Sequence, residues 1–246
     1  MDNLTISPCC NPEMSLEEAL SAYAKLGFGK FEAFTSWVKS AFDFEADPKR
    51  YIDRLAAHGM RLASLHLPPI GDDVDATLAR AVRAARFAAA VGADTVIFKG
   101  ATRELLIRTG RGMLDAVEGL GLSVVLTNHA GTAISTLADY RQVLDGIGDG
   151  RMRTCLEVGH FHSVGVSWRQ GCELLGETIA LVHIKDQVGP QSVPFGDGQI
   201  DLPGLFAHMR SVGYGGDFVV EMEVADRENT LTHLAEAVKY LQAHCL

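Results

Sequence analysis

Acidic, basic and imidazole side chains follow most of the apolar runs of this 246-residue sequence. The residues in these places are Glu32, His66, Lys99, His129, Glu157, His160, His183, Lys185, Glu221 and Glu223. Carboxylates and imidazoles that converge can bind one divalent cation, and a carboxylate beside that cation can take a proton from carbon. The pattern therefore indicates metal-assisted acid–base chemistry on a small molecule.

Three of these residues form the set that we expect to bind the metal, namely Glu157, His183 and Glu221. A single Glu or His at the end of a strand is more often a capping or ion-paired residue, so the prediction depends on the set rather than on any one member. Mixed nitrogen and oxygen ligation suits Mn, Zn, Co or Fe, whereas Mg would be satisfied by the carboxylates and water. We expect one divalent ion, with Mn, Mg, Zn and Co as the candidates.

A second group is expected to bind substrate and consists of His66, His129, Lys185 and Glu32. Lys185 can meet a carboxylate or a phosphate of the substrate, and the alternative is an ion pair with Asp186 or Glu157. For Glu32 the alternative is an ion pair with Lys99 or Lys185. Both interpretations remain open for both residues at this point.

The apolar runs themselves predict eight strands, at Leu4–Ser7, Lys30–Phe34, Arg61–His66, Thr95–Phe98, Ser123–Thr127, Thr154–Glu157, Ala180–Ile184 and Phe218–Glu223. Amphipathic stretches with helix-capping residues and terminal glycines lie between them. This alternation predicts a single-domain (β/α)8 TIM barrel of the α/β class over residues 1–246. A doubly wound open sheet is the main alternative, but the turn after the first strand reads Ser7-Pro8-Cys9-Cys10-Asn11 and lacks a glycine-rich phosphate loop.

Composition limits the partners of the chain. It has 22 Lys+Arg against 31 Asp+Glu and a formal charge of −9, which argues against nucleic acid, and no apolar run approaches a membrane span. Five cysteines, none in a CxxC pair, are typical of reduced thiols, and the first residues lack the pattern of a secretory signal. We expect a cytoplasmic protein with a small-molecule partner, and a homo-oligomer is left open.

Several motifs resemble one known family. They are Ser64–Pro68, Asn128–Thr132, Gly159-His160, His183-Ile184-Lys185-Asp186, Pro194–Asp201, and Gly213–Gly216 followed by Glu221. With these motifs the chain resembles, nearly end to end, the xylose isomerase-like TIM barrel superfamily of sugar (phosphate) isomerases and epimerases, which also contains endonuclease IV. The nuclease activity is excluded by the charge and by the smaller number of metal ligands.

The resemblance implies one divalent metal at the barrel mouth, held by carboxylates of strands five, six and eight and by a His of strand seven. His183 matches the metal-binding His, Glu221 matches the strand-eight Glu, and His160 matches a His that touches substrate oxygens. Two positions depart from the family pattern. Glu157 stands where the family has Asp, and Thr127 stands where it has the strand-five Glu that forms an acid–base pair with the strand-eight Glu.

These departures shape the expected reaction. The hydroxyl of Thr127 is a weak ligand and no base, and the longer Glu157 can reach into the vacated coordination position. We expect a sugar isomerase or epimerase that acts on a ketose, aldose or related compound through a metal-stabilised enediolate, with Glu221, Glu157 and His160 as catalytic residues. A two-base epimerase would need His129 or Glu32 as a replacement base. The alternatives are a metal-dependent lyase or decarboxylase of an oxo-sugar acid and a non-catalytic sugar-binding barrel, and the aromatic segment Phe34–Phe44 is expected to form a wall over the substrate or a subunit contact.

Overall fold

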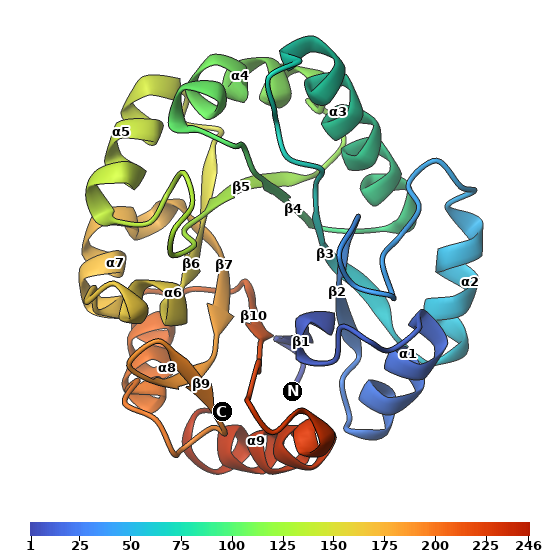
Figure 1. The fold of residues 1–246 in the computed structure, drawn as a ribbon, viewed down its shortest axis with the longest axis vertical. Helices are drawn as coiled ribbons and strands as arrows, with labels where there is room; N and C mark the ends of the chain where they lie inside the picture. Colours follow the sequence, from blue (N-terminus) through green and yellow to red (C-terminus); the bar gives the residue numbers. More distant parts are fainter.

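The computed structural model describes residues 1–246 and consists of a closed barrel of eight parallel strands inside a ring of helices (Figure 1). The strands are β1 (Leu4–Ile6), β2 (Lys30–Phe34), β3 (Arg61–His66), β4 (Thr95–Phe98), β5 (Ser123–Thr127), β6 (Arg153–Glu157), β7 (Ile179–Ile184) and β10 (Asp217–Val220). Their order around the barrel is β1-β10-β7-β6-β5-β4-β3-β2. The predicted TIM barrel is confirmed, with the last strand ending at Val220 rather than at Glu223.

Nine helices connect the strands or close the chain. They are α1 (Leu16–Lys25), α2 (Lys49–Ala57), α3 (Val74–Val91), α4 (Arg103–Ala116), α5 (Leu137–Ile147), α6 (Val158–Ser163), α7 (Trp168–Leu175), α8 (Leu202–Ser211) and α9 (Thr230–His244). Local sequence sets many of their ends. Ser15 and Glu18 form a reciprocal capping box at α1, and Gly92 ends α3 with a φ of 99°, a left-handed conformation that favours glycine.

The loop after β7 contains a hairpin that the sequence did not predict. Strand β8 (Asp186–Val188) pairs antiparallel with β9 (Gln191–Val193). The carboxylate of the buried Asp186 accepts hydrogen bonds from the backbone N–H groups of Gly196, Gly198 and Ile200, at 2.9, 3.0 and 3.2 Å. This side chain therefore fastens the motif Pro194–Asp201 to the end of β7.

The apolar core has two parts. Most buried hydrophobic residues lie between the strands and the helices, and five others form a separate cluster in the barrel interior: Ile97, Val125, Cys155, Leu181 and Val219. Side chains two positions apart on a strand point the same way. The polar residues two positions further along the same strands are Lys99, Thr127, Glu157, His183 and Glu221. The strand period therefore places these side chains above the apolar layer, at the carboxyl end of the barrel.

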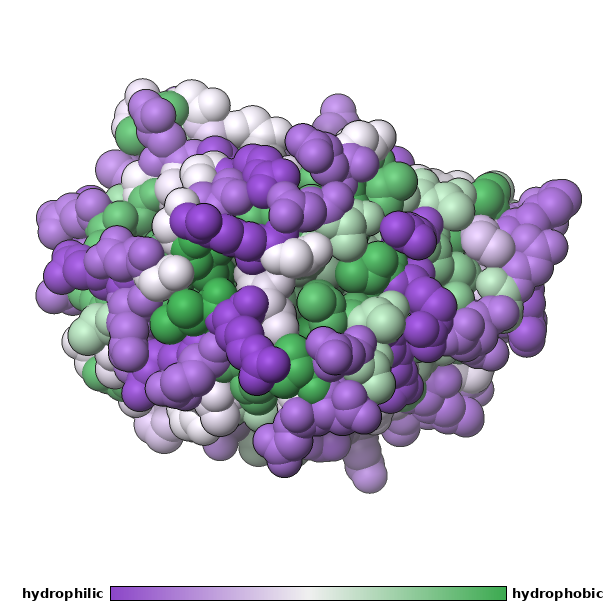
Figure 2. All heavy atoms as spheres, turned by 90° about the horizontal axis from the view of Figure 1, so that it is seen from above, coloured by the Kyte–Doolittle hydropathy of each residue, from purple (hydrophilic) through white to green (hydrophobic).

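The outer surface is mixed in character. On the side face of Figure 2, hydrophilic residues are spread over the whole area, and hydrophobic residues show between them in separate patches. None of the helices combines the length and the hydrophobicity that a membrane span requires.

Candidate functional site

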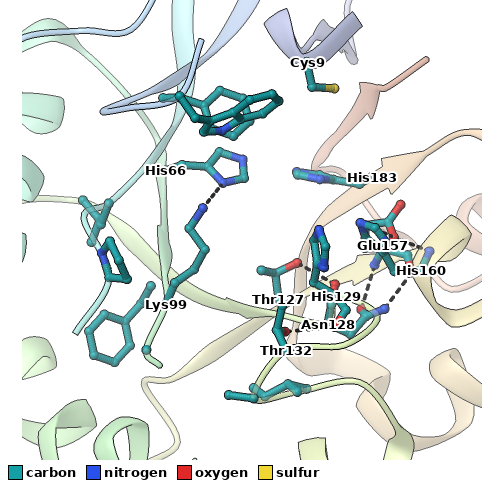
Figure 3. Close-up of a pocket in the computed structure, with 18 of the residues that line it drawn as sticks. Cys9, His66, Lys99, Thr127, Asn128, His129, Thr132, Glu157, His160 and His183 are labelled. Carbon is teal, nitrogen blue, oxygen red and sulfur yellow. Dashed lines mark hydrogen bonds and ion pairs between the residues drawn. The ribbon is translucent and has the colours of Figure 1, made fainter. Parts of the chain in front are cut away.

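A cavity of about 390 Å³ opens at the carboxyl ends of the strands, the face on which TIM barrels carry their active sites. Its size lies in the range of small-molecule sites. Six of the residues predicted to act in the site line it: His66, His129, Glu157, His160, His183 and Glu221. In Figure 3, His66 and Lys99 lie on one side of the cavity, Glu157, His160 and His129 lie on the other, and His183 lies between them. The structure therefore brings most of the predicted residues together.

His183 connects two carboxylates across the barrel interior. Its Nε2 lies 3.1 Å from Oε2 of Glu32 on β2, and its Nδ1 lies 3.1 Å from Oε1 of Glu221, directly after β10. Burial opposes the charged imidazolium, but Cys155, Glu32 and Glu221 together raise the pKa of His183 well above its usual value. The side chain is therefore protonated at neutral pH in the absence of a cation, and both of its N–H groups are directed at carboxylates.

Glu32 is fully buried beneath the cavity and does not line it. Its Oε2 accepts a hydrogen bond from the Ser64 hydroxyl at 2.7 Å. Its Oε1 lies 3.0 Å from Nε2 of His66, but the two atoms are not aligned for a hydrogen bond, and neither has another partner. Burial raises the pKa of Glu32, yet the charge of His183 outweighs it and the net pKa is lowered. An ionised carboxylate oxygen and an imidazole nitrogen thus face one another unsatisfied.

His66 belongs to a stack at the wall of the cavity. Its ring lies on that of Phe34, with centroids 3.9 Å apart, and its Nδ1 lies 3.0 Å from Nζ of Lys99. Burial and the neighbouring ammonium lower the pKa of His66 to about 4. The imidazole is therefore neutral at pH 7. Trp37 continues this wall, with 59% of its surface exposed and its ring edge-on to Phe34.

The carboxylates on the other side are neutralised by Lys185. Its Nζ lies 2.8 Å from Oε2 of Glu221, 3.1 Å from Oε2 of Glu223 and 3.7 Å from Oε1 of Glu157, and only 1% of the residue is exposed. Burial alone would lower the pKa of Lys185, but the three carboxylates raise it well above the usual value. Lys185 therefore keeps its positive charge. Its contacts agree with the ion-pair alternative rather than with a side chain that is exposed to the substrate.

Glu157 combines a structural contact with its position in the cavity wall. Its carboxylate caps α6, because it accepts hydrogen bonds from the backbone N–H groups of Gly159 (3.2 Å) and His160. Burial raises the pKa of Glu157. The His160 ring contacts that of His129, with centroids 3.6 Å apart and the ring planes tilted by 37°. Burial, Lys185 and His129 lower the pKa of His160 to about 3. His160 is therefore a neutral hydrogen-bonding group.

Some placements differ from those that the sequence suggested. Glu32 and Lys185, expected to contact substrate, lie behind the cavity wall and act on it through their neighbours. Cys9 lines the cavity. Its thiol and one carboxylate oxygen each of Glu221 and Glu223 lie within 4.8 Å of one another. Cys9 lies in a short 3-10 turn (Pro8–Cys10), where no periodic pattern could indicate its direction.

Two donor sets that share His183 are available to a cation. Glu157, His183 and Glu221, the predicted ligands, all line the cavity, with Lys185 between the two carboxylates. Glu32, His66 and His183 place one donor atom each within 4.8 Å of one another. The two unsatisfied buried atoms of Glu32 and His66 fit a missing cation, because unpaired buried polar groups are costly. Their nitrogen and oxygen donors suit a transition metal or zinc.

Comparisons with known proteins place this geometry in a family. L-ribulose-5-phosphate 3-epimerase UlaE of Salmonella paratyphi C (strain RKS4594) is 34% identical over 67 residues, which are 26% of this chain and 24% of that protein. In this match the chain therefore spans about a quarter of the length of the curated relative.

Two solved structures share the fold. The 3-keto-D-glucoside 4-epimerase YcjR from E. coli, in its apo form, superposes with a TM-score of 0.80 at 16% identity, covering 98% of this chain and 99% of the other. An IolI protein with a bound zinc atom superposes with a TM-score of 0.78 at 15% identity, covering 98% and 96%. In addition, residues 20–244 match the family described as xylose isomerase-like TIM barrel. The chain belongs to the xylose isomerase-like TIM barrel family.

Proposed function

We propose that this protein is a divalent-cation-dependent enzyme of the sugar isomerase or epimerase type, acting on a ketose, aldose or related hydroxy-carbonyl sugar. Membership in the family, the epimerase activities named for UlaE and YcjR, and the size of the cavity support this proposal. The acidic net charge and the small volume of the cavity favour a small molecule over a macromolecule.

The observation that carries the proposal is the position of the Glu221 carboxylate. It lines the cavity. Its Oε1 lies 3.1 Å from Nδ1 of His183, and its Oε2 lies 2.8 Å from Nζ of Lys185. Burial raises the pKa of Glu221, but Lys185 and His183 lower it well below the usual value. The carboxylate is therefore ionised and fixed in place, ready to accept a proton from a carbon next to a carbonyl group.

A neutral imidazole can supply hydrogen bonds to the substrate. With pKa values of about 4 and about 3, His66 and His160 carry no charge at neutral pH. Both ring nitrogens of His66 face protein groups, Lys99 and Glu32, so His160 is the ring that can donate one hydrogen bond and accept another. Hydroxyl groups of a sugar need both kinds of partner. The exposed ring of Trp37 adds an apolar surface at the rim on which a sugar ring can pack.

The number of available bases bears on the reaction type. Thr127 lines the cavity where the family resemblance expects a second carboxylate. Of the two replacement bases considered, Glu32 is buried away from the cavity, whereas His129 lines it. One-base chemistry, such as aldose–ketose isomerisation or elimination from an oxo-sugar acid, needs only Glu221. Epimerisation by proton exchange on both faces would add His129.

A divalent cation fits beside these groups because His183 is available in either donor set. When bound, such a cation would polarise the carbonyl group and stabilise the negative charge that develops on the substrate. The chain's own contribution is to orient the substrate through His160 and to hold the accepted proton at the Glu221 carboxylate.

The test is proton exchange at carbon. Protein supplied with Mn²⁺ is incubated in D₂O with a panel of ketoses, aldoses, their phosphates and oxo-sugar acids, and proton NMR follows the C–H group next to the carbonyl. Deuterium incorporation with formation of an isomer or epimer supports the proposal. Loss of this proton together with a hydroxyl group from the adjacent carbon, or loss of carbon dioxide from an oxo-sugar acid, would identify a lyase. Sugar binding by calorimetry without exchange in any compound would contradict the enzyme assignment and indicate a binding barrel.

A further inference from the structure

Lys185 takes a place that a cation would need in the predicted carboxylate set. Its ammonium group lies within ion-pair distance of Glu221, Glu223 and Glu157 together. Packing confines the Lys185 side chain, of which only 1% is exposed. Its methylene groups lie against Gly159, where an added Cβ would be 2.3 Å from the Lys185 Cγ. A cation between Glu157 and Glu221 would have to displace this buried ammonium group against like-charge repulsion.

The side of His183 that faces Glu32 and His66 contains a second set of donor atoms and no lysine between them. Glu32, His66 and His183 converge from β2, β3 and β7, with 3.0 Å between Glu32 and His66 and 3.1 Å between Glu32 and His183. Oε1 of Glu32 and Nε2 of His66 are buried without a hydrogen-bond partner. On this side the positive charge is the proton of the His183 imidazolium, which a divalent cation can replace, whereas the carboxylate side contains the ammonium group of Lys185.

The surroundings of this set have the features of a supported metal site. Nδ1 of His183 faces Glu221 at 3.1 Å, so Nε2, which faces Glu32, is the nitrogen that would release its proton to solvent and take a metal ion in its place. The Ser64 hydroxyl fixes the Glu32 carboxylate at 2.7 Å. A carboxylate behind a ligating imidazole sets the tautomer and the orientation of the ring. Two imidazoles and one carboxylate form a donor set typical of Fe, Mn, Co and Zn.

We propose that the divalent cation binds to Glu32, His66 and His183, and not to Glu157, His183 and Glu221. The proposal rests on the cation dependence included in the proposed function and changes where the cation lies. Glu221 then contacts the ligand His183 through one oxygen and Lys185 through the other, and it does not bind the metal. Its carboxylate can therefore accept a proton without first leaving the cation.

One neighbour opposes the cation. Nζ of Lys99 lies 3.0 Å from Nδ1 of His66, and a metal on Nε2 requires a proton on that Nδ1. Lys99 lines the cavity, so its ammonium group can swing into the open space when the metal binds. Replacement of this residue, Lys99→Met, is therefore expected to tighten cation binding, because it removes a positive charge beside a ligand.

The decisive experiment counts the imidazoles on the metal in the unmodified protein. Apoprotein with ¹⁵N-labelled histidine is titrated with Mn²⁺, and pulsed electron paramagnetic resonance counts the coordinated imidazole nitrogens. Two nitrogens on one ion per chain are expected. One nitrogen would overturn this inference and leave the cation dependence of the proposed function standing. A protein that binds no Mn²⁺, Co²⁺ or Zn²⁺ at micromolar concentration would overturn both.

Matched variants provide a second readout in the Kd for Co²⁺, measured by titration of the visible absorption bands. Glu32→Gln and His66→Gln should each weaken binding at least about 100-fold, because a ligand is lost. Glu157→Gln, which alters only the carboxylate set, should change Kd less than about threefold. Circular dichroism and thermal unfolding identify any variant that fails to fold. Retention of binding in folded Glu32→Gln together with its loss in Glu157→Gln would overturn the inference.

Discussion

The side chain of Lys185 lies directly against Gly159. A Cβ built on Gly159 would lie 2.3 Å from Cγ and 2.4 Å from Cδ of Lys185, closer than nonbonded carbon atoms approach. The second residue of α6 therefore has to lack a side chain if the lysine is to reach the carboxylates of Glu157, Glu221 and Glu223. The motif residue Gly159 therefore affects the site indirectly, because it leaves room for the Lys185 side chain that carries the buried ammonium group.

Replacement of this glycine, Gly159→Ala, should displace the Lys185 stem and separate its ammonium group from Glu221. We expect a loss of about 1–3 kcal/mol in the free energy of unfolding, typical of overpacking. Denaturant unfolding measures it, with Gly150→Ala as the control because nothing lies within 4 Å of the added methyl group there. Equal stability of the two variants would contradict the close contact.

Removal of the ammonium group, Lys185→Met, should destabilise the protein by about 3–5 kcal/mol, because three carboxylates lose their common partner inside the protein. Millimolar Mn²⁺ should restore part of this loss in the variant, since the vacated place can then accept a cation. Thermal unfolding with and without Mn²⁺ gives both quantities. The control is Lys239→Met, which breaks an exposed pair with Glu236 and should cost at most about 1 kcal/mol.

The proposed base can be tested with Glu221→Gln, which keeps the size of the side chain and removes its basicity. We expect kcat to fall at least about 100-fold on any substrate found by the deuterium exchange assay, as is typical for a positioned acid or base. The Kd for Co²⁺ measured on the same variant separates loss of the base from disturbance of His183. Turnover near that of the unmodified protein would remove Glu221 from the mechanism.

The carboxylate of Asp186 should be required for the loop after β7. It accepts hydrogen bonds from four backbone N–H groups, of Gln187, Gly196, Gly198 and Ile200. The Asp186→Asn variant turns one acceptor oxygen into a donor that faces N–H groups, at a cost of at least about 2 kcal/mol. Denaturant unfolding and limited proteolysis within residues 194–201 would show the loss. The exposed neighbour provides the control, Asp197→Asn, and the expectation fails if both variants are equally stable and resistant.

Stability should depend on pH through His160. Burial, Lys185 and His129 lower its pKa from 6.5 to about 3, so between these values the unfolded chain binds a proton that the folded protein does not. The free energy of unfolding is therefore unaffected by His160 above pH 6.5. As the pH falls from 6.5 toward 3, it decreases by up to about 1.4 kcal/mol for each pH unit because of this histidine. Chemical unfolding from pH 7 to 4 compares the unmodified protein with His160→Gln. The slope should be smaller in the variant, and equal slopes would contradict the lowered pKa.

Most of the fold could be predicted from the sequence because its signals are local. Short apolar runs define strands, Ser15 with Glu18 begins α1 and Gly92 ends α3, and these interactions join residues only a few positions apart. The alternation of side chains along a strand also predicted which polar residues would reach the barrel mouth, since each lies two positions beyond an interior apolar residue. The β8–β9 hairpin was missed because its loop is stabilised by hydrogen bonds that the Asp186 carboxylate accepts from backbone N–H groups 12 and 14 positions further along the chain.

The pairing of the polar residues was decided only by the closed barrel. Glu32 and His183 are 151 positions apart in the chain, and their strands are not neighbours in the sheet, so their contact crosses the interior. The path of Lys185 likewise depends on the absence of a side chain at Gly159 in α6. The sequence by itself determined that ionisable groups gather at the carboxyl end of the barrel, but the structure places two of them, Glu32 and Lys185, behind the cavity wall. Packing across the barrel interior decides which of these groups form ion pairs with one another and which are left to bind a cation. The reason is that an ion pair or a hydrogen bond requires its two atoms to lie about 3 Å apart.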